Sequence, residues 1–234
     1  MRKEYFFSDK QALITACTMA ISDVVGAAAQ SGGATLLVSG GSTPKAIYTQ
    51  LANTDLAWHK VSIAMVDERY VPLTHPDSNE AMIKSCLVTG RASAADFNGL
   101  YSKAGSLVDA AANAQQVYSS LAKGSDLVIL GMGSDGHTAS LFPSADGITT
   151  AMDKTSQRII FPLLANKSDV TGENLERISL GLAAILSAKK IILLITGDDK
   201  LAVYKQALTA DANELPVAGV LQQNSTPVDV YWAP

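Results

Sequence analysis

The sequence predicts an α/β fold with a mostly parallel β-sheet and helices on both faces. Short apolar runs alternate with longer segments in which apolar residues recur at helical spacing, and this alternation is typical of a parallel sheet. Three of the apolar runs pass directly into loops rich in glycine and polar residues. Because ligands bind beyond the carboxyl ends of the strands in open α/β sheets, we expect these loops to meet at one site.

Strands are predicted where a short apolar run is bounded by glycine or polar turn residues. Runs such as ATLLV and DLVIL have almost no polar positions, which indicates strands that are buried on both faces of the sheet. The strands are expected at residues 34–38, 61–66, 98–101, 126–130, 158–164, 177–182, 190–195 and 228–232.

Helices are predicted where apolar residues recur every three or four positions. In the first helix Leu13, Cys17 and Ile21 share one face, and the sequence Ser-Gly-Gly at 31–33 ends the segment. The helices are expected at residues 10–30, 44–51, 79–87, 105–122 and 197–208.

We predict that residues 1–234 form a single α/β domain, because no linker separates two units. Residues 144–174 follow no regular pattern, and a small irregular subdomain or the border of an active site is expected there. The hydrophobic fraction of 47% is sufficient for a substantial core.

The composition also restricts the partners. A formal net charge of -4 without a basic patch argues against nucleic acid and against an anionic membrane surface. The N-terminal residues do not resemble a signal peptide, and no uninterrupted apolar run approaches the length of a membrane span. Cys17 and Cys86 have neither disulfide-framework nor metal-ligand spacing. We therefore expect a cytoplasmic protein, a monomer with a homodimer as the alternative.

The first polar loop reads Gly40-Gly41-Ser42-Thr43, followed by Pro44. Paired glycines permit a close approach of the backbone, and proline at the first helical position favours a helix start. Free N–H groups at such a start bind phosphate well, so we predict an anion-binding loop. An ordinary capped turn is the alternative, and the spacing of a Walker P-loop is absent.

The second loop is Asp67-Glu68-Arg69, three adjacent charges directly after an apolar run. Arg69 suits a phosphate, because a guanidinium can donate two parallel hydrogen bonds to it. Asp67 is placed with it as a substrate-binding residue, either orienting a partner or acting as a base. A solvated turn with local ion pairs is the alternative.

The third loop, residues 131–137, reads GMGSDGH. It matches the dinucleotide-binding pattern G-x-G-x-x-G, but Asp135 would repel a pyrophosphate and Pro143 shortens any following helix. We instead predict His137 as a general base and Asp135 as the carboxylate that holds its tautomer. A structural histidine remains one alternative. A metal site formed with Asp67 is another, although it lacks a recognised ligand spacing.

Lys200 lies in the first turn of a predicted helix, where a cation opposes the helix dipole. This position favours a role in ligand binding over that of a surface lysine. No G-x-S-x-G elbow is present, and no cysteine follows a strand at a turn. The remaining chemistry is general-base attack by water, or proton transfer on a sugar phosphate.

Several ordered segments together resemble a known family. They are LLVSGGSTPKAIY (36–48), VDERYVPLTHPDSNEAM (66–82), DLVILGMGSDGHTASLFP (126–143), ERISLGLAAILSAKKIILLITGDDK (176–200) and PVAGVLQ (216–222). These segments resemble the 6-phosphogluconolactonases, within a wider group that includes the glucosamine-6-phosphate deaminases. The resemblance covers nearly the whole chain.

The resemblance implies a Rossmann-like parallel sheet, no organic cofactor, and hydrolysis of 6-phospho-D-glucono-1,5-lactone in the oxidative pentose phosphate pathway. It implies that His137 activates the water that attacks the lactone carbonyl and that Asp135 orients His137. Arg69, Lys200 and the loop 40–43 would hold the 6-phosphate.

Two positions separate the lactonases from the deaminases. The deaminases carry a glutamate where this chain has Phe142, and their second loop reads Asp-Glu-Tyr where this chain has Arg69 before Tyr70. Both favour the lactonases, although Gly181 replaces the threonine expected in their pattern. A deaminase or isomerase of amino sugar phosphates and a non-catalytic sugar-phosphate sensor remain the alternatives.

Overall fold

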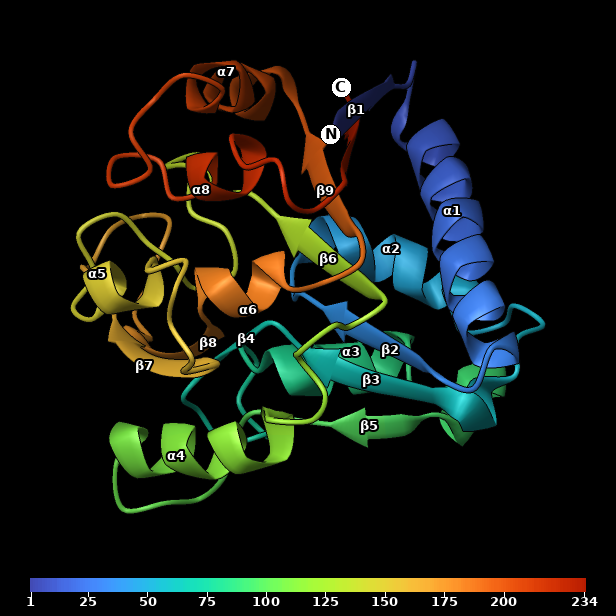
Figure 1. Ribbon diagram of the computed structural model, residues 1–234, viewed down its shortest axis with the longest axis horizontal. Coiled ribbons are helices and arrows are strands. Elements are labelled where there is room, and N and C mark those ends of the chain that lie inside the picture. The colour runs from blue at the N-terminus through green and yellow to red at the C-terminus, as the bar shows by residue number, and fades with distance from the viewer.

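Seven parallel strands form the central sheet of the computed structural model, which describes residues 1–234 (Figure 1). In spatial order they are β1 (Arg2–Phe6), β10 (Val228–Ala233), β9 (Ile191–Thr196), β6 (Leu127–Gly131), β2 (Ala34–Val38), β3 (Val61–Met65) and β5 (Asp96–Asn98). Helices cover both faces of this sheet, which confirms the predicted fold class.

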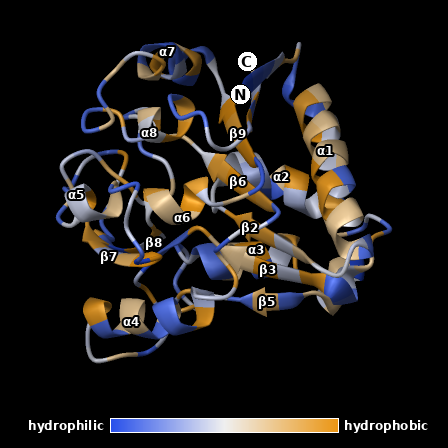
Figure 2. Cartoon of the chain, in the orientation of Figure 1, coloured by the Kyte–Doolittle hydropathy of each residue, from blue (hydrophilic) through white to orange (hydrophobic).

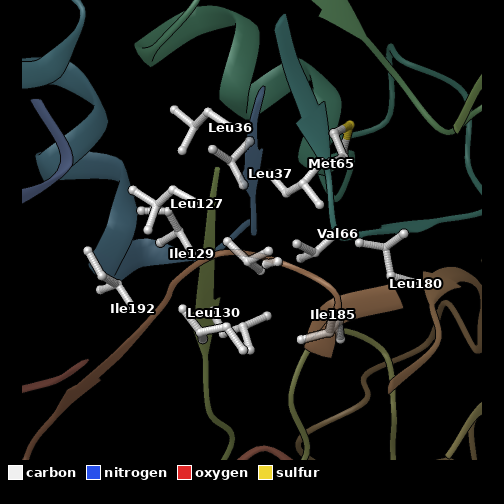
Figure 3. Packing of buried hydrophobic residues seen from close by; sticks show 14 of the residues in the cluster. Leu36, Leu37, Met65, Val66, Leu127, Ile129, Leu130, Leu180, Ile185 and Ile192 are labelled. Carbon is white, nitrogen blue, oxygen red and sulfur yellow. The ribbon is translucent and has the colours of Figure 1, made fainter. Parts of the chain in front are cut away.

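The inner strands form where the sequence is apolar on both sides. Consecutive residues of a strand point to opposite faces, and Leu36 and Leu37 of β2 are both fully buried. Figure 3 shows these side chains among those of Met65 and Ile129 from the neighbouring strands. Figure 2 shows the same strands as predominantly hydrophobic. Packing on both faces of the sheet therefore fixes the strands relative to one another. It also fixes the positions of the loops that follow their carboxyl ends.

The helices mostly follow the predicted ranges. They are α1 (Lys10–Gln30), α2 (Ser42–Leu51), α3 (Asn79–Cys86), α4 (Leu107–Tyr118), α5 (Ile148–Ala151), α6 (Leu182–Leu186), α7 (Asp198–Ala207) and α8 (Ala218–Leu221). Two 3₁₀ turns accompany them, η1 (Trp58–Lys60) and η2 (Gly90–Ala94). The short helices α5, α6 and α8 were not predicted, because four or five residues give no measurable helical period.

Helix α1 is capped by Asp9, whose side chain accepts a hydrogen bond of 2.8 Å from the N–H of Ala12. By length and composition this helix is also apolar enough to cross a membrane, which the search for uninterrupted apolar runs overlooked. Its apolar stripe, including Leu13, Cys17 and Ile21, is buried in the core. The helix packs against β2 and β10 of the central sheet.

A second sheet of three antiparallel strands lies beside the first. Its order is β4 (Asp67–Arg69), β8 (Glu176–Leu180) and β7 (Ile160–Leu164). Two predictions are corrected here. The residues 67–69 form a strand, not a loop, because after Val66 the chain leaves the central sheet and pairs with β8. The strand predicted at 177–182 ends at Leu180, since Gly181 is the N-cap of helix α6, which begins at Leu182.

Both edges of the central sheet differ from the prediction. Strand β1 was not predicted, because all five of its residues are exposed and three of them are charged. Among the strands it pairs with β10 alone, in parallel, and its side chains add an aromatic contact of Tyr5 with Tyr231 and a hydrogen bond from Tyr204 to Glu4. At the other edge, β5 covers residues 96–98, not 98–101, and its polar sequence DFN carries no apolar run. Edge strands need no two-sided burial, so the pattern used to find the inner strands does not mark them.

Candidate active site

A cavity of about 400 Å³ opens beyond the carboxyl ends of the central strands. Its walls come from the loops that follow β2 and β6, from strand β4 and from the first turn of α7. Eight of the nine predicted site residues line it: Gly40, Gly41, Ser42, Thr43, Asp67, Arg69, His137 and Lys200. The ninth, Asp135, forms a hydrogen bond with the side chain of His137. The structure thus brings the predicted residues together, and their roles remain predictions.

His137 and Asp135 form a close pair in the loop after β6. The Nδ1 atom of His137 lies 2.5 Å from Oδ1 of Asp135, and the same oxygen accepts a bond of 3.1 Å from the backbone N–H of His137. Burial raises the pKa of Asp135, but the hydrogen bonds and charge of His137 outweigh it, and the pKa is lowered overall. A carboxylate bound at Nδ1 leaves Nε2 free to accept a proton.

The loop that carries this pair is closed by its own backbone. The N–H of Gly133 donates to the carbonyl of His137 over 3.0 Å, and the N–H of Gly136 donates to the carbonyl of Gly133 over 3.1 Å. Gly136 has a φ of 76°, which favours glycine. Position 133 has no room for a side chain, because a Cβ there would lie 2.1 Å from Nδ1 of His137. The glycines therefore permit the histidine–aspartate contact.

The loop 40–43 presents the N-terminus of α2 to the cavity. Gly41 occupies the cap position with a φ of 116°, and no side chain caps the helix. The first N–H groups of α2 therefore have no side-chain acceptor and are suited to an anion. A Cβ on Gly40 would overlap the amide of Asn79, so this glycine permits close packing between the loop and α3.

Glu68 organises the wall formed by β4 and α3. Its carboxylate is fully buried and accepts four hydrogen bonds. The donors are the N–H groups of Arg69, Asn79 and Glu80 and the hydroxyl of Ser78. Burial raises the pKa of Glu68 to about 7, and the three N–H groups oppose the rise. Glu68 thus fixes the start of α3, and with it Asn79, against β4.

Replacing Glu68 with glutamine is expected to lower the free energy of unfolding by about 2–4 kcal/mol, because an amide N–H₂ would face N–H donors that it cannot satisfy. Urea denaturation measures the change. Glu173→Gln, in an exposed ion pair with Lys167, is the control and should change the free energy by less than about 1 kcal/mol. Equal stability of the two variants would contradict the role given to Glu68.

The remaining charged residues of the cavity differ in their surroundings. The carboxylate of Asp67 accepts a bond of 2.6 Å from the hydroxyl of Ser140. Arg69 donates through Nη1 to the carbonyl of Asp77 over 2.6 Å. Lys200 lies in the first turn of α7, where burial lowers the pKa of its ammonium and the charge of Asp135 opposes the fall. Three cations, Arg69, Arg177 and Lys200, and two carboxylates, Asp67 and Asp169, therefore line the same space.

Several cavity residues were not predicted. Among them are Ser39, Asn79, Ser140, Phe142 and Arg177. In the sequence Phe142 serves only to separate the two branches of the family, yet its ring packs against the imidazole of His137 with 4.1 Å between centroids. Arg177 sits in an apolar strand pattern, and its approach to the site depends on the pairing of β4 with β8. The one signal in the sequence for a role of Arg177 at the site is that an arginine interrupts an otherwise apolar strand.

A metal centre finds no support in the arrangement of the side chains. No three histidine, cysteine, aspartate or glutamate residues form a group able to hold a metal ion. The alternative of a metal held by Asp67, Asp135 and His137 therefore lacks the necessary cluster.

Comparison with known proteins identifies the family. The model of the glucosamine-6-phosphate isomerases/6-phosphogluconolactonase family matches residues 8–232. A 6-phosphogluconolactonase of Mesorhizobium japonicum is 40% identical over 97% of this chain and 94% of its own length. One of Pseudomonas putida is 39% identical over 89% of this chain and 83% of its own. The crystal structure of a 6-phosphogluconolactonase from Shewanella baltica has a TM-score of 0.93 at 35% identity and covers 100% of this chain and 98% of its own. The chain therefore belongs to the glucosamine-6-phosphate isomerase/6-phosphogluconolactonase family.

Proposed function

We propose that the chain hydrolyses 6-phospho-D-glucono-1,5-lactone to 6-phosphogluconate, a step of the oxidative pentose phosphate pathway. The observation that carries this proposal is the His137–Asp135 pair at 2.5 Å inside a cavity whose walls also bear Arg69 and Lys200. Such a pair activates water, and such cations hold a phosphate. Relatives named 6-phosphogluconolactonase, at 39–40% identity, support the same reaction.

The phosphate anchors the substrate. Its oxygens accept hydrogen bonds from the first N–H groups of α2, in the loop 40–43, and from the side chains of Arg69 and Lys200. Asp67 lines the same cavity, and its carboxylate accepts a hydrogen bond from a hydroxyl of the sugar. Binding at these groups holds the lactone carbonyl near His137. This positioning lowers the entropic part of the activation barrier.

His137 then transfers the protons. Its Nε2 takes a proton from water while the water oxygen bonds to C1 of the lactone, and a tetrahedral oxyanion forms. Collapse of this intermediate breaks the bond between C1 and the ring oxygen, which takes the proton back from the imidazolium. The products are a free hydroxyl and a carboxylic acid, which releases its remaining proton to solvent and becomes a carboxylate. Asp135 holds the imidazole and stabilises its charge throughout. Water is the one co-reactant in this scheme.

Phe142 favours this reaction over the deaminase alternative. Ring opening of an amino sugar phosphate uses a further carboxylate, which the deaminases carry at this position. Here the position holds Phe142, which is 5% exposed and whose ring packs against His137 at an interplanar angle of 35°. The ring contributes packing and no acid or base.

The experiment offers the purified protein two substrates. Acid release from freshly prepared 6-phosphogluconolactone, above the spontaneous rate, is the expected result. Ammonia release from glucosamine 6-phosphate without acid release from the lactone would support the deaminase. Thermal stabilisation by sugar phosphates without either reaction would support a sensor.

Arg69 should contribute mainly to binding. Replacing it with alanine is expected to raise KM for the lactone by about tenfold to a hundredfold with little change in kcat, because a charge-assisted hydrogen bond contributes about 1.5–3 kcal/mol. Steady-state kinetics separates the two constants. Arg91→Ala, at an exposed pair with Asp55, is the control. An unchanged KM in the Arg69 variant would count against the phosphate contact.

The proposal also includes the setting of the enzyme. The substrate class is a small sugar phosphate, as in the related enzymes. We propose a cytoplasmic monomer, and the cytoplasm is favoured by N-terminal residues unlike a signal peptide and by two cysteines without disulfide-framework spacing. Sedimentation of the purified protein would reveal a homodimer, the alternative.

A further inference from the structure

Two arginines lie directly opposite each other in the small sheet. In the antiparallel pair of β4 and β8, Arg69 is the register partner of Arg177, and Asp67 is the partner of Ser179. Residues two apart on a strand share a face, so these four side chains project from one face of the sheet. Both arginines line the cavity.

Arg177 is buried without an acidic partner. Only 2% of the residue is exposed, and neither Arg177 nor Arg69 forms an ion pair with a carboxylate. Its guanidinium donates to the carbonyls of Asn174 and Thr171, the latter over 2.8 Å, and lies 5.6 Å from the centre of the Phe142 ring. These contacts orient the group but supply no ion pair, so its charge is balanced only by more distant acids, Asp67, Glu68 and Asp77.

This arrangement is unfavourable in the absence of an anion. Like charges directly opposite each other destabilise a strand pair, and a buried charge without a partner costs free energy. Burial and the neighbouring charge of Arg69 lower the pKa of Arg177 to about 10, and the charges of Asp67, Glu68 and Asp77 oppose the fall. The acid on the same face, Asp67, already accepts a hydrogen bond from Ser140. An anion between the two guanidinium groups would relieve both costs.

We propose that Arg69 and Arg177 form a clamp for the phosphate group of the substrate, with Arg177 as a second binding arginine supplied by β8. The inference rests on the proposed function, since the phosphate is that of the lactone. Two guanidinium groups match the charge of a phosphate monoester and offer it parallel hydrogen bonds. Because strand pairing fixes the spacing of the two arginines, the clamp is preorganised.

The test replaces Arg177 with lysine, which keeps the charge and removes the planar set of donors. Competitive inhibition by inorganic phosphate and by gluconate is measured together with KM and kcat for 6-phosphogluconolactone. We expect Arg177→Lys to raise both KM and the inhibition constant of phosphate by about tenfold, the loss of roughly one charge-assisted hydrogen bond. The inhibition constant of gluconate and kcat should stay within about twofold.

Arg158→Lys is the matched control. Arg158 also donates to a backbone carbonyl, that of Ile160 over 2.7 Å, and lies 5.2 Å from an aromatic ring, that of Phe161. It does not line the cavity. The Arg158 variant should therefore leave phosphate inhibition unchanged, which separates anion binding from the loss of an arginine–aromatic contact.

Two outcomes would overturn the clamp. A fall in kcat and in thermal stability with unchanged phosphate inhibition would make Arg177 a support for residues 171–174. A rise in the inhibition constant of gluconate alone would place Arg177 near C1, the carbon that becomes the carboxylate of the product.

Calorimetric titration with inorganic phosphate needs no turnover, so it tests the clamp even if the wild-type protein fails to hydrolyse the lactone. If Arg177→Lys does not fold, Arg69→Lys tests the other half of the clamp by the same titration. Unchanged phosphate affinity in Arg69→Lys would then reject the clamp.

Discussion

Replacing His137 with alanine is expected to lower kcat for lactone hydrolysis by about a hundredfold to ten-thousandfold, the usual contribution of a positioned general base. The imidazole is the group held by Asp135 at 2.5 Å with its second nitrogen free. The variant leaves the loop 40–43, Arg69 and Lys200 in place, so KM should change little. A loss in kcat at constant KM is the signature of a group that acts on the reacting atoms.

Initial rates at saturating lactone, corrected for spontaneous opening, measure this effect. His59→Ala is the control, since His59 is exposed on the turn η1 and does not line the cavity. It should retain the wild-type kcat. If His137→Ala also retained it, the base would have to be another group and the assignment would be wrong.

The second large effect is expected at Gly133. A Cβ at this position would lie 2.1 Å from Nδ1 and 2.2 Å from Cε1 of His137, and 2.5 Å from Oδ1 of Asp135. The alanine variant must therefore push the imidazole away from its carboxylate. Since a displacement of about 1 Å can cost about a hundredfold in rate, we expect kcat to fall by about that factor while both residues of the pair are still present.

Gly105→Ala provides the control for Gly133→Ala. Gly105 is exposed, and a Cβ there meets only a side-chain oxygen of Asp109 at 3.6 Å. Its kcat should remain near the wild-type value. A Gly133→Ala variant with full activity would show that the contact between His137 and Asp135 is dispensable.

The inner strands were predictable because strands buried on both faces have continuous apolar sequences. Strands β2, β6 and β9 are buried on nearly every residue, so their apolar runs identify them directly. The edge strand β1 has no such apolar run, and its position depends on backbone pairing with β10, more than 200 residues away. The small sheet was missed as a unit because antiparallel pairing of β4 with β8 is a property of the tertiary structure.

The candidate site shows the same division. The spacing of Asp135 and His137 within one glycine-rich loop already indicated a pair, and both residues lie where a strand ends. Arg177 gave no comparable signal, because its approach to Arg69 depends on a strand register between residues 108 positions apart (177 − 69). Local patterns thus predict single loops, whereas the pairing of distant side chains requires the fold.

The most direct test of the central claim is the lifetime of freshly prepared 6-phosphogluconolactone, followed by acid release at constant pH with and without the protein. Unphosphorylated gluconolactone is measured in parallel. We predict that the protein shortens the lifetime of the phosphorylated lactone far below its spontaneous value and leaves the unphosphorylated lactone nearly unaffected. Equal lifetimes with and without the protein would contradict the proposed reaction, and equal acceleration of both lactones would contradict the phosphate anchor.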